Sequence, residues 1–316
     1  MEPVGPRSTA NEPRFANIGT FARLPRLDQV GQAEIAILGA PFDAGTSYRP
    51  GARFGPLAIR NGSQLLRPFD PALAIGPFST VQVADAGDLA INPYSIAEAV
   101  ESIAAGARAA YGSARRLLVL GGDHTVALPL IRAASERFGR LALVHFDAHL
   151  DTWDTYFGAP YTHGTPFRRA FEEGLLAQDA SVHAGIRGPL YGQSDLDEDS
   201  GMGFEIVTAD EIALESAATL AERIRSRTAE HPVYLSIDID VLDPSAAPGT
   251  GTPEAGGPSS AQVLRLLRAL ASLPIVGADV VEVSPSYDHA EITAIAASHI
   301  AYTTIGLMAL AASASR

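Results

Sequence analysis

Short apolar runs alternate along the chain with longer amphipathic stretches. The runs are continuously apolar, which is typical of strands buried on both faces of a parallel sheet. The amphipathic stretches between them are typical of helices that cover such a sheet. We therefore predict an α/β fold. The predicted strands span residues 34–40, 80–85, 116–121, 140–146, 181–186, 204–208, 232–238 and 275–282, and the predicted helices span 95–111, 125–138, 214–229 and 259–271.

The sequence favours one domain, because it contains no repeat, no low-complexity block and no long linker. We predict a single catalytic domain over residues 31–316 and an N-terminal arm over residues 1–30, packed on or near it. Residues 243–258 are rich in Gly and Pro, but they join a predicted strand to a predicted helix and are expected to wrap the site. Residues 150–168 form a second expected long loop.

Composition narrows the classes of function. Apolar residues make up 47% of the 316 residues, which is enough for a large core. The net charge of −13 argues against nucleic acid or an anionic membrane as a partner and favours a small cationic substrate. Apolar runs such as 35–40 and 117–120 are too short to cross a bilayer, so we expect a cytoplasmic enzyme. The absence of cysteine excludes thiolate catalysis and sulfur-ligated zinc.

Three of the predicted strands end in clusters of His and Asp, at 121–124, 147–151 and 238–240. The carboxyl ends of parallel strands meet at one edge of the sheet, where ligands bind. The two-residue period of a strand directs alternate side chains the same way within each of the last two clusters. We predict that six side chains converge as metal ligands: His124, Asp147, His149, Asp151, Asp238 and Asp240.

The charge of these six residues indicates two metal ions. A lone Asp at a strand end usually caps the strand, but four buried carboxylates would repel one another, and two divalent cations would balance them. Oxygen and nitrogen donors without sulfur favour Mn²⁺ over a structural zinc. Two such ions about 3.5 to 4 Å apart lower the pKa of a bound water toward 7. The sequence therefore predicts a binuclear hydrolase with two Mn²⁺ per chain. We leave His145, Asp85 and Asp88 outside the site as structural residues.

The motifs at 121–124 (GGDH), 147–151 (DAHLD) and 236–244 (SIDIDVLDP) resemble the metal motifs of the ureohydrolase family, which includes arginase and agmatinase. The resemblance extends from about Gly39 to the C-terminal helix. It implies a three-layer α/β/α sandwich around an eight-stranded parallel sheet, a fold shared with deacetylases, and a homo-oligomer, a trimer or hexamer. It also implies one manganese held by His124, Asp147, Asp151 and Asp238, and a second held by Asp147, His149, Asp238 and Asp240.

The resemblance further implies a guanidino substrate, which family members cleave to urea and an amine. Glu282 matches the family residue that grips the guanidinium, a planar cation that a carboxylate holds by paired hydrogen bonds. His163 matches a family histidine thought to shuttle protons, and its ordinary pKa of about 6.5 suits protonation of the departing amine. Asp151 or a neighbour is expected to accept a proton from the attacking water.

The variable segments favour agmatine, which would yield putrescine and urea. Residues 152–157 lack the Asn- and Ser-rich loop of arginase-like chains, and residues 42–56 and 247–253 resemble the agmatinase branch. Trp153 and Asp154 are predicted to contact the substrate, with Asp154 attracting the terminal ammonium of agmatine; a solvated loop residue is the alternative. Hydrolysis of 4-guanidinobutyrate or 3-guanidinopropionate stays open, because those enzymes share the core motifs.

Two rival classes are disfavoured. A deacetylase-like enzyme would use one zinc and fewer ligands, whereas the double ligand set is complete here. A non-catalytic metal-binding homologue would have lost ligands or Glu282, and none of these residues is missing.

Overall fold

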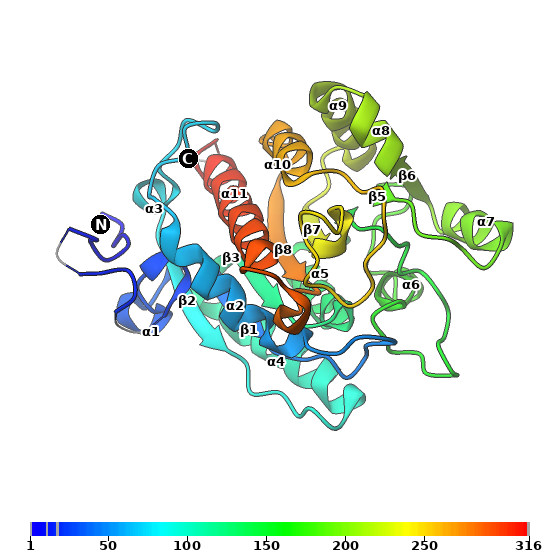
Figure 1. Ribbon diagram of the computed structural model, residues 1–316, viewed down its shortest axis with the longest axis horizontal. Helices are drawn as coiled ribbons and strands as arrows, with labels where there is room; N and C mark the ends of the chain where they lie inside the picture. Colours follow the sequence, from blue (N-terminus) through cyan, green and yellow to red (C-terminus); the bar gives the residue numbers. More distant parts are fainter. Residues whose placement is uncertain (1, 11, 17–18, 315–316) are drawn as a thin grey trace.

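Eight parallel strands form one sheet at the centre of the structure (Figure 1), a computed structural model that describes residues 2–10, 12–16 and 19–314. Their order across the sheet is β2-β1-β3-β8-β7-β4-β5-β6, which confirms the predicted eight-stranded parallel sheet. The strands are β1 (Ala33–Ala40), β2 (Val83–Asp88), β3 (Ala114–Gly121), β4 (Ala142–Phe146), β5 (Ser181–Ile186), β6 (Phe204–Thr208), β7 (Val233–Asp238) and β8 (Ile275–Val281).

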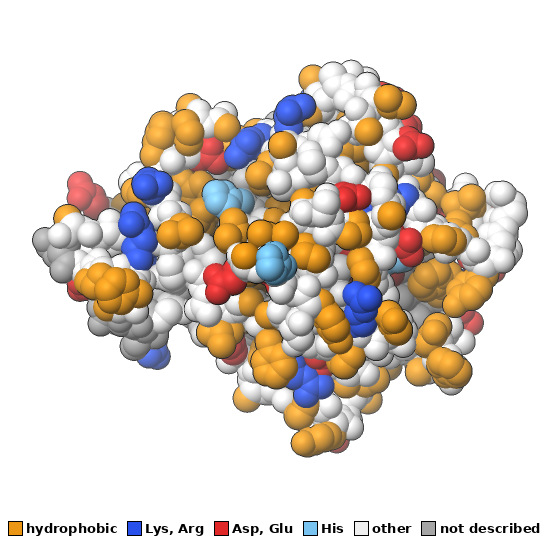
Figure 2. All heavy atoms as spheres, in the orientation of Figure 1, with side chains coloured by type: hydrophobic (Ala, Val, Ile, Leu, Met, Phe, Trp, Pro, Cys, Tyr) orange, Lys and Arg blue, Asp and Glu red, His pale blue; other side chains and the backbone are white. Residues whose placement is uncertain are grey.

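Helices cover both faces of the sheet, which confirms the three-layer sandwich. In β1, Ile35 and Ile37 pack into a core with α2, α9, α10 and α11, whereas Ala36 and Leu38 pack on the opposite face with α4, α5 and α6. Figure 1 shows α2 and α11 lying across the nearer face, and Figure 2 shows acidic and basic side chains interspersed with apolar ones on that face. The helices are α1 (Leu27–Val30), α2 (Gly55–Gly62), α3 (Pro77–Thr80), α4 (Ile96–Ser113), α5 (Ala127–Phe138), α6 (Pro166–Glu172), α7 (Gln193–Gly201), α8 (Ala209–Leu214), α9 (Ala217–Thr228), α10 (Ser260–Ala269) and α11 (Ile292–Ala314).

Local capping explains where the predicted helices begin. The Ser95 side chain accepts a hydrogen bond from the Glu98 N–H, so α4 starts where the sequence predicts. Ser216 caps α9 in the same way, and this helix begins after the predicted start at 214 because a separate short helix, α8, precedes it. The second strand begins at Val83 rather than at 80, because residues 77–80 form a helical turn.

The last helix, α11, corrects one expectation. We expected no segment long enough to cross a membrane, but α11 has the length and, with a mean hydropathy of 1.5, the composition to do so. Its most apolar window is 78% buried within the molecule, and Ile300, Ile305 and Met308 belong to the core between the sheet and α2. The helix is apolar because it packs inside the fold on nearly all sides.

The end of the N-terminal arm is joined to the domain by hydrogen bonds. Phe21 is fully buried, and its N–H donates to Asp85 Oδ2 over 2.7 Å. The Arg60 guanidinium pairs with Asp85 and Asp88, with 2.9 Å between Arg60 Nε and Asp85 Oδ2. Both Asp residues are thus engaged structurally, as the sequence predicts. Residues 1, 11, 17 and 18 of the arm and residues 315 and 316 of the domain lie outside the described residues.

Candidate metal centre and substrate site

Four neighbouring strands bring the predicted residues to one edge of the sheet. β3, β8, β7 and β4 are consecutive in the sheet. His124 follows β3, Glu282 follows β8, Asp238 ends β7 and Asp147 follows β4. Since the strands are parallel, their carboxyl ends meet at the same edge, as ligand sites in such sheets require.

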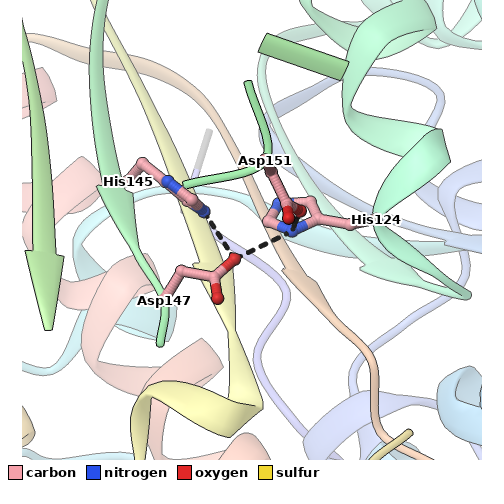
Figure 3. Close-up of side chains that lie close together, drawn as sticks. All are labelled: His124, His145, Asp147 and Asp151. Carbon is pink, nitrogen blue, oxygen red and sulfur yellow. Dashed lines mark hydrogen bonds and ion pairs between the residues drawn. The ribbon is translucent and has the colours of Figure 1, made fainter. Parts of the chain in front are cut away.

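The first donor cluster consists of His124, Asp147, Asp151 and Asp238. Nδ1 of His124 lies 2.9 Å from Asp151 Oδ2, 3.2 Å from Asp147 Oδ2 and 3.4 Å from Asp238 Oδ2. Figure 3 shows the first two carboxylates directed at the His124 ring. Nδ1 is buried and has no hydrogen-bond partner among the described residues. One nitrogen and three carboxylate oxygens therefore face the same small volume.

A hydrogen-bond network on the Nε2 side of the ring, away from the carboxylates, orients His124. Ser236 Oγ donates to Asp279 Oδ1 over 2.7 Å, so it accepts from Nε2 of His124 over 2.8 Å. Tyr234 donates to the second oxygen of Asp279 over 2.7 Å. This network places the proton on Nε2 and leaves the lone pair of Nδ1 toward the carboxylates, which is the tautomer that a metal ligand needs.

The second donor cluster consists of Asp147, His149 and Asp240. Nδ1 of His149 lies 3.2 Å from Asp147 Oδ1 and 3.2 Å from Asp240 Oδ2. Asp147 belongs to both clusters, with Oδ2 facing His124 and Oδ1 facing His149. Asp238 Oδ1 accepts the Asp240 N–H over 2.8 Å, which ties the two clusters together a second time.

The electrostatics of the two clusters suit divalent cations. Burial, followed by the neighbouring Asp240 and Asp147 carboxylates, raises the pKa of Asp238 well above its ordinary value. Burial and then Asp147 raise the pKa of Asp240 to about 6. Positive charge between these carboxylates would relieve both effects. The residues present therefore fit two cations held by oxygen and nitrogen donors.

Two site residues have an unusual backbone. Asp151 has a φ of 54° and Glu282 a φ of 61°, in the left-handed region that non-glycine residues rarely occupy. Such a conformation costs of order 1–3 kcal/mol. Eight other described non-glycine residues share it, so it shows that the fold fixes the backbone of both carboxylates but does not by itself assign them to the site.

Glu282 lies beside the first donor cluster with one oxygen unused. Its Oε1 accepts the His124 N–H over 2.9 Å and lies 3.1 Å from Nδ1 of His163. Its Oε2 is buried and has no hydrogen-bond partner among the described residues. A buried carboxylate oxygen without a donor is costly, and a guanidinium would supply one.

His163 is held between Glu282 and Ser47. Burial lowers the pKa of His163, but the hydrogen bond to Glu282 and the negative charges of Glu282, Asp151 and Asp123 together outweigh burial and raise the pKa to about 9. On the other side, the Ser47 N–H donates to Nε2 over 3.1 Å, and Ser47 Oγ lies 2.6 Å from the same nitrogen. The Ser47 N–H requires a lone pair on Nε2, and a neutral ring with its proton on Nδ1 provides it while donating to Glu282. The charge of Glu282 favours the doubly protonated ring instead.

Comparison with known proteins identifies the family. The model of the Arginase family matches residues 33–306. The chain belongs to the arginase family. A guanidinopropionase from Pseudomonas aeruginosa is 44% identical over 98% of each chain. Putative agmatinase 1 from Schizosaccharomyces pombe is 41% identical over 96% of this chain and 85% of its own length. The solved structure of proclavaminate amidino hydrolase from Streptomyces clavuligerus superposes with a TM-score of 0.91, at 43% identity, over 95% of this chain and 100% of that one.

These findings confirm the resemblance to ureohydrolases and the predicted fold. The protein is an arginase-family amidinohydrolase that acts on a guanidino compound. Arginase-family enzymes depend on a binuclear metal centre, and the two donor clusters are where this chain provides suitable ligands.

Trp153 and Asp154 lie in the loop that follows β4 in this arginase-family chain. The Trp153 ring packs on Gly164, where an added Cβ would lie 2.8 Å from the ring, and its centroid is 5.7 Å from that of Tyr191. The Asp154 side chain is 61% exposed and pairs with Arg169, with 2.6 Å between Oδ1 and Nη2. Both residues line a cavity of about 290 Å³ whose other walls are Thr152, Thr155, Tyr156, Phe157, Tyr191, Asp195 and Glu198.

From its place inside a strand, His145 was expected to lie outside the site, and the structure corrects this. His145 is fully buried, as expected of a core residue, but its Nε2 lies 2.8 Å from Asp147 Oδ2 (Figure 3). Burial lowers the pKa of His145 to about 3, so the imidazole is neutral. The two-residue period that groups Asp147 with His149 also includes His145, so the signal was present in the sequence.

Asp123, in the motif at 121–124, was not among the predicted site residues, but it holds two segments of the site together. It is fully buried, and its Oδ2 accepts the Gly45 N–H over 2.7 Å. The Gly45 carbonyl in turn accepts the His163 N–H over 3.1 Å. Asp123 therefore anchors the segment that carries Ser47 against the loop that carries His163. Its partners are distant in sequence, so no local pattern could have identified them.

Proposed function

We propose that this amidinohydrolase cleaves agmatine to putrescine and urea and uses two Mn²⁺ per chain. The observation that carries the proposal is the buried, unpartnered Oε2 of Glu282 beside the two donor clusters. A cationic planar group is the ligand that this oxygen lacks. The donor set of carboxylates and imidazoles without sulfur supports manganese.

In this proposal the residues of the chain bind, orient and move protons. Glu282 accepts hydrogen bonds from the guanidinium and so places its carbon beside the clusters. The two cations, when bound, supply a hydroxide near neutral pH. Asp151 or a neighbouring carboxylate accepts the proton that the attacking water retains, and His163 delivers a proton to the departing amine. The contact between His163 and Glu282 keeps the ring beside the substrate.

The cavity that Trp153 and Asp154 line supports agmatine. Its walls combine Asp154, Asp195 and Glu198 with aromatic rings, and such a surface attracts an ammonium group through charge and cation–π contacts. Glu198 is already paired with Arg168 over 2.6 Å, so Asp195 and the rings contribute most. One observation favours the alternative, a guanidino acid: Arg169 already pairs with Asp154 and offers a partner for a substrate carboxylate. The guanidinopropionase relative agrees with that alternative.

A substrate panel tests the proposal. We expect the manganese-loaded protein to release urea from agmatine with a kcat/KM about tenfold above that for 4-guanidinobutyrate, 3-guanidinopropionate or arginine, which is the effect of about 1.4 kcal/mol. Urea is measured for each compound under identical conditions. Urea from none of the four would reject the proposed function, and a preference for a guanidino acid would replace agmatine by the alternative.

Asp154→Asn tests whether the Asp154 carboxylate binds the terminal ammonium group of agmatine. We expect the KM for agmatine to rise up to about fivefold, because an exposed charge pair contributes only modestly, and the KM for 4-guanidinobutyrate to stay the same or fall. Asp179→Asn is the matched control, since Asp179 is equally exposed and precedes β5 at the opposite edge of the sheet. An unchanged KM for agmatine in Asp154→Asn would assign the side chain to its ion pair with Arg169 alone.

The trimeric or hexameric assembly and the cytoplasmic location expected from the sequence stay predictions.

A further inference from the structure

A row of buried polar side chains extends behind the metal centre, on the far side of Asp147. Nε2 of His145 lies 2.8 Å from Asp147 Oδ2, and Nδ1 of His145 lies 2.7 Å from Nδ1 of His183. Nε2 of His183 lies 3.2 Å from Asp199 Oδ1. All four residues are fully buried. Of these four residues, only Asp147 belongs to the donor clusters of the proposed function.

The hydrogen-bonding capacity of each group assigns a direction to this row. An ionised carboxylate can only accept, so His145 presents the N–H of Nε2 to Asp147. In a neutral imidazole the other nitrogen is then an acceptor, so Nδ1 of His183 donates to Nδ1 of His145. Asp147 and His183 therefore favour the same tautomer of His145, one from each edge of the ring.

Asp199 ends the row on α7, far in sequence from every metal motif. Thr152, which follows the ligand Asp151, donates to Asp199 Oδ1 over 2.9 Å. Asp199 Oδ2 and His183 Nε2 are buried and have no hydrogen-bond partner in the part of the chain that the structure describes. A buried carboxyl oxygen and a buried ring nitrogen with unmet hydrogen bonds oppose folding, so their presence calls for a role other than packing.

The rings are held firmly in place. The His183 ring stacks on Phe204, with centroids 4.4 Å apart and an interplanar angle of 25°, and the centroid of Phe167 lies 4.3 Å from that of His145. Because aromatic rings pack against His145 and His183, the two imidazoles make their polar contacts only through the nitrogen atoms at their edges. The polar edges of both rings thus point along the row from Asp199 to Asp147.

We propose that His183 and Asp199 are positioning residues of the metal centre, which fix His145 so that it donates to Asp147. Asp147 is the carboxylate common to both donor clusters, so its orientation affects both metal ions. The proposal rests on the metal centre of the proposed function. Partners that orient metal ligands from outside the coordination sphere typically change metal affinity by about 10- to 100-fold.

The test compares two variants of His183 by Mn²⁺ affinity, measured on metal-free protein by competition with a chelating indicator. His183→Leu removes the N–H, and we expect affinity to fall about 10- to 100-fold. His183→Asn places its amide nitrogen near the position of Nδ1, and we expect it to recover most of the parent affinity. If the Leu variant does not fold, Asp199→Ala gives the same comparison from the other end of the row.

Phe78→Leu is the matched control, because it removes a buried ring of the same kind in α3, just before β2, at the other end of the strand order from β5 and the row. It should lower the melting temperature and leave Mn²⁺ affinity unchanged. Parent-like affinity in His183→Leu and in Asp199→Ala, or equal losses in His183→Leu and His183→Asn, would overturn the proposal. A parent protein that binds no Mn²⁺ would instead reject the metal centre of the proposed function, so the two failures are distinguishable.

Discussion

Glu282→Gln is expected to remove nearly all urea release while the metal content stays at the parent level. The amide keeps the shape of the carboxylate but not its charge, and Oε2 is the buried atom that lacks a donor. Loss of one partner from a buried, hydrogen-bonded charge pair costs about 2–5 kcal/mol, so kcat/KM should fall roughly 30-fold to several-thousand-fold. Urea release and elemental analysis on the same preparation measure both effects.

The same substitution at Glu34 is the control. Glu34 pairs with Arg116 near the amino ends of β1 and β3. The donor clusters lie at the opposite edge of the sheet, beyond the carboxyl ends of the strands. Glu34→Gln should therefore retain parent activity. Parent-like kcat/KM in Glu282→Gln would show that the guanidinium is held by another group. Loss of metal in that variant would assign Glu282 to the metal centre itself.

Asp147→Ala should abolish stable binding of both metal ions, because Asp147 is the residue that the two donor clusters share. Its Oδ2 faces His124 and its Oδ1 faces His149. Removal of a direct ligand should weaken metal binding by more than the roughly 100-fold upper range for outer partners. Elemental analysis after dialysis, and calorimetric titration of the metal-free protein with Mn²⁺, give the number of ions and their affinity.

Asp151→Ala and Asp240→Ala are the comparison for this prediction. Asp151 contacts only His124 of the two ligand histidines, at 2.9 Å, and Asp240 contacts only His149, at 3.2 Å. Each change should weaken mainly one ion, so the pair separates the two sites. Two tightly bound ions per chain in Asp147→Ala would contradict the shared role of that carboxylate.

The strands and the ligand clusters could be predicted because both depend on local patterns. Continuous apolar runs identified all eight strands, and the placement of His and Asp at the ends of three of them indicated one edge of a parallel sheet. Patterns of this kind failed where packing decides the outcome. α11 is apolar enough to resemble a membrane span, and only its burial under α2 and against the sheet identifies it as a core helix.

In the site, too, some features could be predicted from the sequence and others depend on the tertiary structure. Charge balance among four Asp residues predicted cations without any knowledge of geometry, since crowded carboxylates repel wherever they lie. Which carboxylate is shared could not be derived in that way, because it depends on distances between strands. His145 shares the two-residue period of Asp147 and His149 but was left out, since a histidine inside a strand is ordinarily a core residue. Its contact with Asp147 decides that it takes part in the site.

By itself, the sequence determined the fold class, the residues able to bind metal and the need for two cations, because these follow from periodicity and charge. The family resemblance already implied that Asp147 and Asp238 serve both metal ions. The tertiary structure alone decided that Asp147 faces both His124 and His149, that Glu282 has a free buried oxygen and that Asp199 lies behind the site. These facts join segments that are distant in the chain. Their contacts depend on how the sheet orders its strands and on how the connecting loops return to one edge, and no local pattern records either.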